Sequence, residues 1–100
     1  MTYTATIYFL GDYKPLHIED SAPAKVKIRL AHAIENAAPD LRDSLNQGIS
    51  EAMKGIAKGY SATTWEHGSM GLSLRAGPRD RFLDHITDTM PECPNLNYNA

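Results

Sequence analysis

Residues 39–60, PDLRDSLNQGISEAMKGIAKGY, form the longest regular hydrophobic pattern in the chain, and the rest of the fold has to accommodate it. Apolar side chains recur here at steps of three and four residues, from Leu41 to Tyr60. This spacing predicts an amphipathic helix that begins at Pro39. Its apolar face has to be covered by the remaining elements.

A stripe of small residues flanks that apolar face: Ser44, Gly48, Ala52, Gly55 and Gly59. Glycine in a helix interior costs about 1 kcal/mol relative to alanine, so Gly48 and Gly55 need a structural reason. We expect another backbone to approach closely at this stripe. Packing against a sheet and self-association of the chain would both bring one there.

Two β-hairpins are predicted on either side of the helical middle of the chain. Residues 2–10 alternate between two kinds of side chain, which is typical of a half-buried strand. Residues 16–19 can return as a strand, which should be short or at an edge because Pro15 has no N–H for a ladder. Residues 61–76 form a second hairpin with its turn at 67–69.

The segment 24–31 fits two structures. As a helix that follows the start signal at residues 20–23, it presents an apolar face that runs on to residue 37. As a strand, it would present Lys25, Lys27 and Arg29 on one face. We favour the helix, extending through Asn36, because it explains the start signal.

A third helix is expected over residues 78–89. Pro78 would open it and Pro91 would end it. Its buried stripe would consist of Phe82, Leu83, Ile86 and Met90. The tail, residues 91–100, has little to bury and should be irregular.

These elements predict one α+β domain over residues 1–100, in the order β-β-α-α-β-β-α. A small antiparallel sheet of two hairpins, with helices packed on one face, satisfies that order.

Composition narrows the class of protein. Of the 100 residues, 42% are hydrophobic and 22% charged, which is typical of a globular chain. The net charge of −2 argues against a dedicated nucleic-acid binder. With Cys93 as its single cysteine, no basic leader and no long apolar run, the chain is expected to be cytoplasmic, with no membrane contact.

No cofactor or metal is expected. The four histidines show no close pairing with one another or with the cysteine, and the sequence has no nucleophile elbow.

One enzymatic alternative involves the second hairpin and the helix after it. Glu66, His67 and His85 could act as acid and base in a metal-independent ribonuclease, with Arg75 holding phosphate. Geometry opposes this alternative, because His67 and Arg75 lie at opposite ends of one hairpin, about 20 Å apart.

A second alternative is a DNA-binding dimer. Under the strand interpretation of residues 25–29, Lys25, Lys27 and Arg29 would form a basic ribbon. A helix there would remove it.

The leading hypothesis is a non-enzymatic protein-binding module that forms a homodimer or binds a larger protein. Small inhibitors of host or competitor proteins, such as phage anti-defence (anti-CRISPR) and immunity proteins, are of this kind. Aromatic, apolar, small and basic residues without a clear core position are the interface candidates. They are Tyr8, Tyr13, Ile28, Gly48, Gly55, Tyr60, Trp65, Arg75 and Tyr98.

Overall fold

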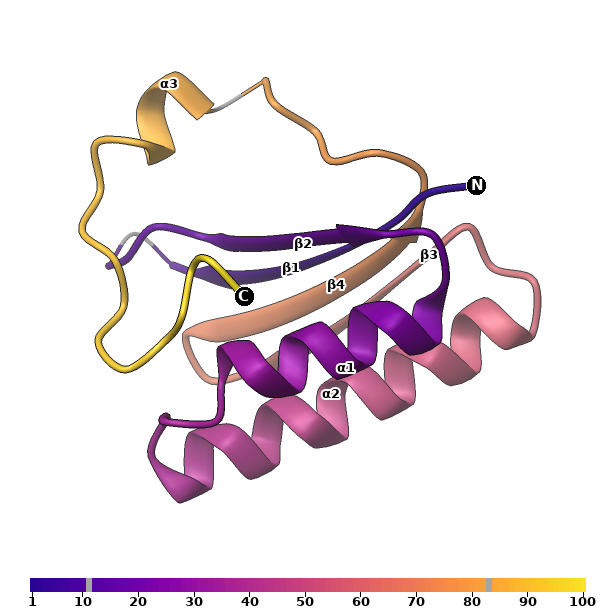
Figure 1. Cartoon of the computed structure of the whole chain (residues 1–100), viewed down its shortest axis with the longest axis horizontal. Coiled ribbons are helices and arrows are strands. Elements are labelled where there is room, and N and C mark those ends of the chain that lie inside the picture. Colours follow the sequence, from indigo (N-terminus) through magenta and orange to yellow (C-terminus); the bar gives the residue numbers. More distant parts are fainter. Residues whose placement is uncertain (11, 83) are drawn as a thin grey trace.

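A computed structural model describes residues 1–10, 12–82 and 84–100, and it confirms the α+β class and the predicted order of elements (Figure 1). Along the chain these are β1 (Tyr3–Phe9), β2 (Leu16–Asp20), α1 (Pro23–Ala33), α2 (Pro39–Ala57), β3 (Ala62–His67), β4 (Met70–Ala76) and α3 (Asp84–Thr87).

The four strands form one antiparallel sheet in the order β2-β1-β4-β3. The two hairpins are joined through their first and last strands, with Tyr3 opposite Ala76 and Phe9 opposite Met70. β1 and β4 are therefore central, and β2 and β3 form the two edges.

Alternation along the strands sends one set of side chains into the core. β1 contributes Ala5 and Ile7. The residues that pair with them on β2 and β4 are also buried: Ile18 and Leu16, Leu74 and Leu72. α1 and α2 cover this face of the sheet, as Figure 1 shows. The buried centre consists of Ala5, Ile7, Leu16, Ile18, Val26, Leu30, Ala33, Ile34, Ala37, Leu45, Ile49, Ala52, Met70, Leu72 and Leu74.

The ambiguous segment is helical, so the strand interpretation is wrong. α1 begins at Pro23 and ends at Ala33, three residues before the expected end. Its N-cap is Ala22, without a side-chain cap, because the Asp20 carboxylate instead accepts the adjacent Ser21 N–H at 2.7 Å. Of residues 20–23, which predicted the start of the helix, Pro23 therefore has the main effect, because its fixed φ suits the first helical turn.

The small-residue stripe of α2 packs against side chains of β3, not against another backbone. A Cβ on Gly48 would lie 2.6 Å from Cε3 of Trp65, and a Cβ on Gly55 would overlap Cγ2 of Thr63. The Thr63 hydroxyl also donates to the Ala52 carbonyl at 2.8 Å. The two glycines thus allow the edge strand to lie close to the helix, which is the sheet-packing alternative rather than self-association.

The third helix is much shorter than expected. α3 spans only Asp84–Thr87, and Phe82 and Ile86 are 80% and 53% exposed instead of buried. Leu83, which was placed in the same stripe, lies outside the described residues. The stripe has no apolar surface to pack on, because α1 and α2 occupy one face of the sheet (Figure 1). The other face carries polar side chains.

The tail, residues 91–100, contains no helix or strand, and part of it packs against the rest of the protein. Cys93 is buried, and Leu96 and Tyr98 pack against the core. The Tyr98 hydroxyl donates to the Lys14 carbonyl at 2.5 Å and accepts the Cys93 N–H at 2.9 Å. These contacts attach the tail to the first hairpin, while most of its other side chains are exposed. None of the described helices has the length and apolar composition that a membrane crossing requires.

Candidate functional site

The outer face of the sheet, away from α1 and α2, is polar. Its rows follow from the strand register: Thr6 lies between His17 and Ser73, and Thr4 lies between Glu19 and Arg75. Hydroxyl, imidazole and charged groups therefore cover the outer face of the sheet. This face is not suited to pack a second hydrophobic core.

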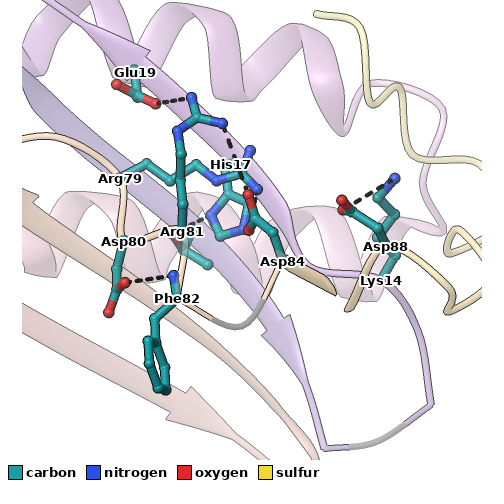
Figure 2. A network of polar contacts seen from close by, with 10 residues as sticks. Lys14, His17, Glu19, Arg79, Asp80, Arg81, Phe82, Asp84 and Asp88 are labelled. Atoms are coloured by element: carbon teal, nitrogen blue, oxygen red, sulfur yellow. Dashed lines mark hydrogen bonds and ion pairs between the residues drawn. The ribbon is translucent and has the colours of Figure 1, made fainter. Parts of the chain in front are cut away.

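A roof segment, residues 77–82 and 84–88, crosses this polar face. The Thr4 hydroxyl donates to the Gly77 carbonyl at 2.8 Å and fixes the start of the segment to β1. An Arg79 guanidinium nitrogen lies 2.5 Å from an Asp84 carboxylate oxygen and closes the segment on itself (Figure 2). Arg81 reaches Glu19 on β2 at 3.6 Å and Asp84 at 3.8 Å. Polar contacts thus hold the roof in place.

A cleft of about 250 Å³ lies between the roof segment and the sheet. Its floor carries hydroxyls and one guanidinium, and its roof carries two carboxylates. The lining residues are Thr4, Thr6, Tyr8, Pro15, His17, Ser73, Arg75, Asp80, Asp84 and Thr87. Carbon atoms of these side chains make up most of the exposed lining, so the cleft suits a group with an apolar stem and a polar end.

His17 lines both this cleft and a second cavity of about 210 Å³ beneath the C-terminal tail, as do Pro15 and Thr87. Its Nδ1 lies 2.8 Å from the Thr6 hydroxyl. Burial, followed by the nearby Arg79 guanidinium, lowers the pKa of His17 below its usual 6.5. The imidazole is therefore neutral at pH 7 and offers one donor and one acceptor nitrogen.

The Arg79–Asp84 pair is the most closely packed charge pair of the cluster, with both side chains about one-fifth exposed. The hydrogen bond from Arg79 is the main cause that lowers the pKa of Asp84. Within the described residues, Nε of Arg79 is buried without a hydrogen-bond partner. Through its contact with Asp84, Arg79 thus mainly stabilises the conformation of the roof segment.

Two of the predicted interface residues, Tyr8 and Arg75, line the cleft. Tyr8 lies across Gly71 and its hydroxyl donates to Glu66 at 3.1 Å. Burial is the main cause that raises the pKa of the Tyr8 phenol, followed by the hydrogen bond to Glu66. Arg75 is exposed at the mouth of the cleft.

The other interface candidates are dispersed. Ile28 on α1 and Tyr60 beyond α2 are 60% and 62% exposed, and neither lines the cleft. The Tyr13 ring packs edge-on against Phe9, with ring centroids 5.5 Å apart. Trp65, Gly48 and Gly55 pack between α2 and β3, and Tyr98 holds the tail.

The ribonuclease constellation does not assemble. Glu66 points to the outer face, where it accepts the Tyr8 hydroxyl, while His67 stacks on Trp65 next to α2. His85 is exposed on α3 and does not line the cleft. Strand alternation explains the separation, because neighbouring residues of β3 point to opposite faces.

The basic ribbon is also absent, since residues 25–29 are helical. Lys25 contacts the Ser21 hydroxyl at 3.3 Å. Arg29 turns back, with one nitrogen 3.6 Å from Asp20 and another donating to the Ala100 carbonyl at 2.9 Å. These cations serve local contacts instead of forming one stripe.

Sequence reasoning missed His17, Asp80 and Asp84 as a group. Threonines at alternate positions of β1 indicate a polar face of the sheet. Pairing of β1 with the next strand would place His17 on that same face. No local signal shows that the chain after β4 folds back over that face. Within the described ranges, no group of three or more histidine, cysteine or acidic side chains is placed to hold a metal ion.

No family model matches the sequence, and no curated protein or solved structure shows significant similarity to it. Fold and site together define an α+β protein with a four-stranded antiparallel sheet. Two helices cover one face of this sheet, and a polar cleft lies on the other.

Proposed function

We propose that this protein is a non-enzymatic protein-binding module and that the roof segment with its cleft is the surface that contacts the partner. The exposure of Phe82 and Ile86, four residues apart on that segment, carries the proposal. Contact with a partner would remove the surface of both apolar side chains from water, which is favourable. Aromatic side chains of this kind are typical anchors of protein interfaces.

The surroundings of Phe82 support the same proposal. Its ring points away from the Arg79–Asp84 pair, and its N–H is held by the Asp80 carboxylate at 2.9 Å, so its base is fixed while the ring is exposed (Figure 2). The cleft, which Asp80 lines two residues before Phe82, offers a guanidinium and two carboxylates. An apolar anchor flanked by polar groups is the usual composition of a protein interface.

The partner chemistry follows from this arrangement. We expect a protein surface with an apolar depression for Phe82 and a polar side chain that enters the cleft near Arg75. The narrower expectation from the sequence, that this chain inhibits a larger protein, stays a prediction.

Site-specific photo-crosslinking tests the proposal. A photoreactive phenylalanine analogue at position 82 should capture one protein from a lysate of the organism that encodes the chain, while the same analogue at position 28 should not. Purified partner should then bind the wild type and lose affinity for a Phe82→Ser, Ile86→Ser double variant. Ile28→Ser is the matched control, because Ile28 is also a large exposed apolar side chain but lies on α1.

Equal affinity of the double variant and the Ile28→Ser control would contradict the proposal. So would turnover of RNA by the purified chain that disappears in a His17→Gln variant, because an enzyme would then use the same cleft.

A further inference from the structure

The two edges of the sheet are protected to different degrees. Beside β2, Pro15 lacks an N–H, and the Lys14 N–H donates to the Pro91 carbonyl at 2.7 Å. The Glu19 carbonyl of β2 itself accepts the Arg29 guanidinium at 2.5 Å. Proline, a covering segment and a cation on an edge carbonyl all prevent another strand from pairing there.

β3 has no comparable protection. Among the described helices and strands, only α2 and β4 contact it. The Ala76 N–H donates to the Ser61 carbonyl at 2.8 Å, so Ser61 directs its backbone groups toward β4. By alternation, the N–H and C=O groups of Ala62, Thr64 and Glu66 point to the open side.

The sequence of β3 also favours pairing. Ala62–His67, ATTWEH, contains no proline and no lysine, the residues that commonly block an open edge. Two threonines and a tryptophan have high strand propensity. The strand is therefore extended, exposed on one side and ready to form a ladder.

We propose that two copies of this chain associate through β3, as antiparallel strands related by a two-fold axis at Thr64. In this register Thr64 pairs with Thr64 of the second copy, and Ala62 pairs with Glu66. All outward N–H and C=O groups of Ala62, Thr64 and Glu66 are then satisfied on both chains. A register shift by one residue would place these N–H and C=O groups opposite residues of the second copy whose backbone groups already form hydrogen bonds with its own β4.

Side chains fit the same register. Glu66 faces the small Ala62 of the second copy instead of another carboxylate, so no like charges oppose each other. Trp65 faces Thr63 of the second copy, and aromatic–β-branched pairs across strands are stabilising.

The charges of α2 are complementary in this arrangement. A two-fold axis perpendicular to the sheet places both α2 helices on the same face, in opposite directions. Asp40 and Asp43, exposed at the start of α2, then lie toward the end of the α2 of the second copy, where Lys58 is exposed and Lys54 contacts Glu51 of its own helix at 3.2 Å. A self-complementary surface of this kind forms a closed dimer. Because the β2 edge is blocked, assembly should stop at two chains.

Sedimentation velocity over a range of protein concentrations tests the proposal. The wild type should form a reversible dimer and no larger species. Thr64→Pro removes an outward N–H that β4 does not use, and it should leave only monomer. Thr64→Val keeps that N–H and the branched shape, so it should remain dimeric.

A charge-exchange pair tests the register without proline. Ala62→Glu opposes two carboxylates at each end of the ladder and should raise the dimer dissociation constant about two- to thirtyfold. Adding Glu66→Lys to Ala62→Glu should restore association.

Amide hydrogen exchange gives a readout that does not depend on variants. The N–H groups of Ala62, Thr64 and Glu66 should exchange more slowly as the concentration rises, while those of Thr63 and Trp65 should not change. A wild type that stays monomeric at all concentrations, or a dimer that persists in Thr64→Pro, would overturn the proposal. The roof segment lies across the sheet from β3, so neither result bears on the proposed partner surface.

Discussion

Tyr8 and Glu66, 58 residues apart in the chain, meet across β4, where the Tyr8 hydroxyl donates to the Glu66 carboxylate at 3.1 Å. The ring crosses directly over Gly71, which faces both residues in the strand register. A glycine at this point of a central strand has a steric purpose, because any Cβ there would overlap the phenol ring.

Gly71→Ala should therefore destabilise the protein by about 1–3 kcal/mol, since the new methyl has to displace the Tyr8 ring. Tyr8→Phe should cost only about 0.5–1 kcal/mol, because it removes one partly exposed hydrogen bond. Denaturant unfolding measures both. In a Tyr8→Ala background the cost of Gly71→Ala should fall, and equal costs in the two backgrounds would mean that the ring is not the obstacle.

The Gly55–Thr63 contact gives a second prediction. Gly55→Ala should lower the free energy of unfolding by about 1–3 kcal/mol despite the better helix propensity of alanine, because its Cβ would overlap Cγ2 of Thr63. Thr63→Ser removes that methyl and keeps the hydroxyl that donates to the Ala52 carbonyl. In this background the helix propensity of alanine, about 1 kcal/mol, should offset most of the cost. A substitution that costs as much with serine as with threonine at position 63 would exclude this contact as the cause.

His17 should make stability depend on pH. Its pKa in the folded protein lies below 6.5, chiefly through burial, so the unfolded chain binds more protons in the interval between the two values. Stability should fall as the pH decreases from about 8 through 6.5 toward the folded pKa, and this contribution should level off below it. His17→Gln should flatten the wild-type curve in chemical unfolding over this range. A curve that stays steep in His17→Gln would refute the assignment.

Tyr98 should tie the tail to the first hairpin. Tyr98→Phe removes the bond to the Lys14 carbonyl and leaves the Cys93 N–H without its acceptor, which should cost about 1–3 kcal/mol. The variant should also expose Cys93, whose thiol pKa burial raises, to faster reaction with a thiol reagent. Tyr60→Phe, in an exposed ring, is the matched control. Unchanged thiol reactivity in Tyr98→Phe would show that the tail is held by other contacts.

The sequence by itself determined the secondary structure wherever the hydrophobic period extended over a whole element. Alternation in β1 and the three-and-four spacing of α2 depend only on which side chains must avoid water, so the α+β class, the two hairpins and the order of elements could be predicted. The glycines of α2 indicated a close approach, although not that Trp65 and Thr63 are the side chains that make it.

Only the tertiary structure determines the conformation and position of the chain after β4. The stripe of Phe82 and Ile86 predicts a buried helix, but α1 and α2 already cover one face of the sheet and the other is polar. Ion pairs from Arg79 and Arg81 to Asp84 and Glu19 fold the segment over that face instead, and this leaves the apolar side chains in water. The cleft arises from contacts between residues far apart in the chain, and a local pattern contains no information about them.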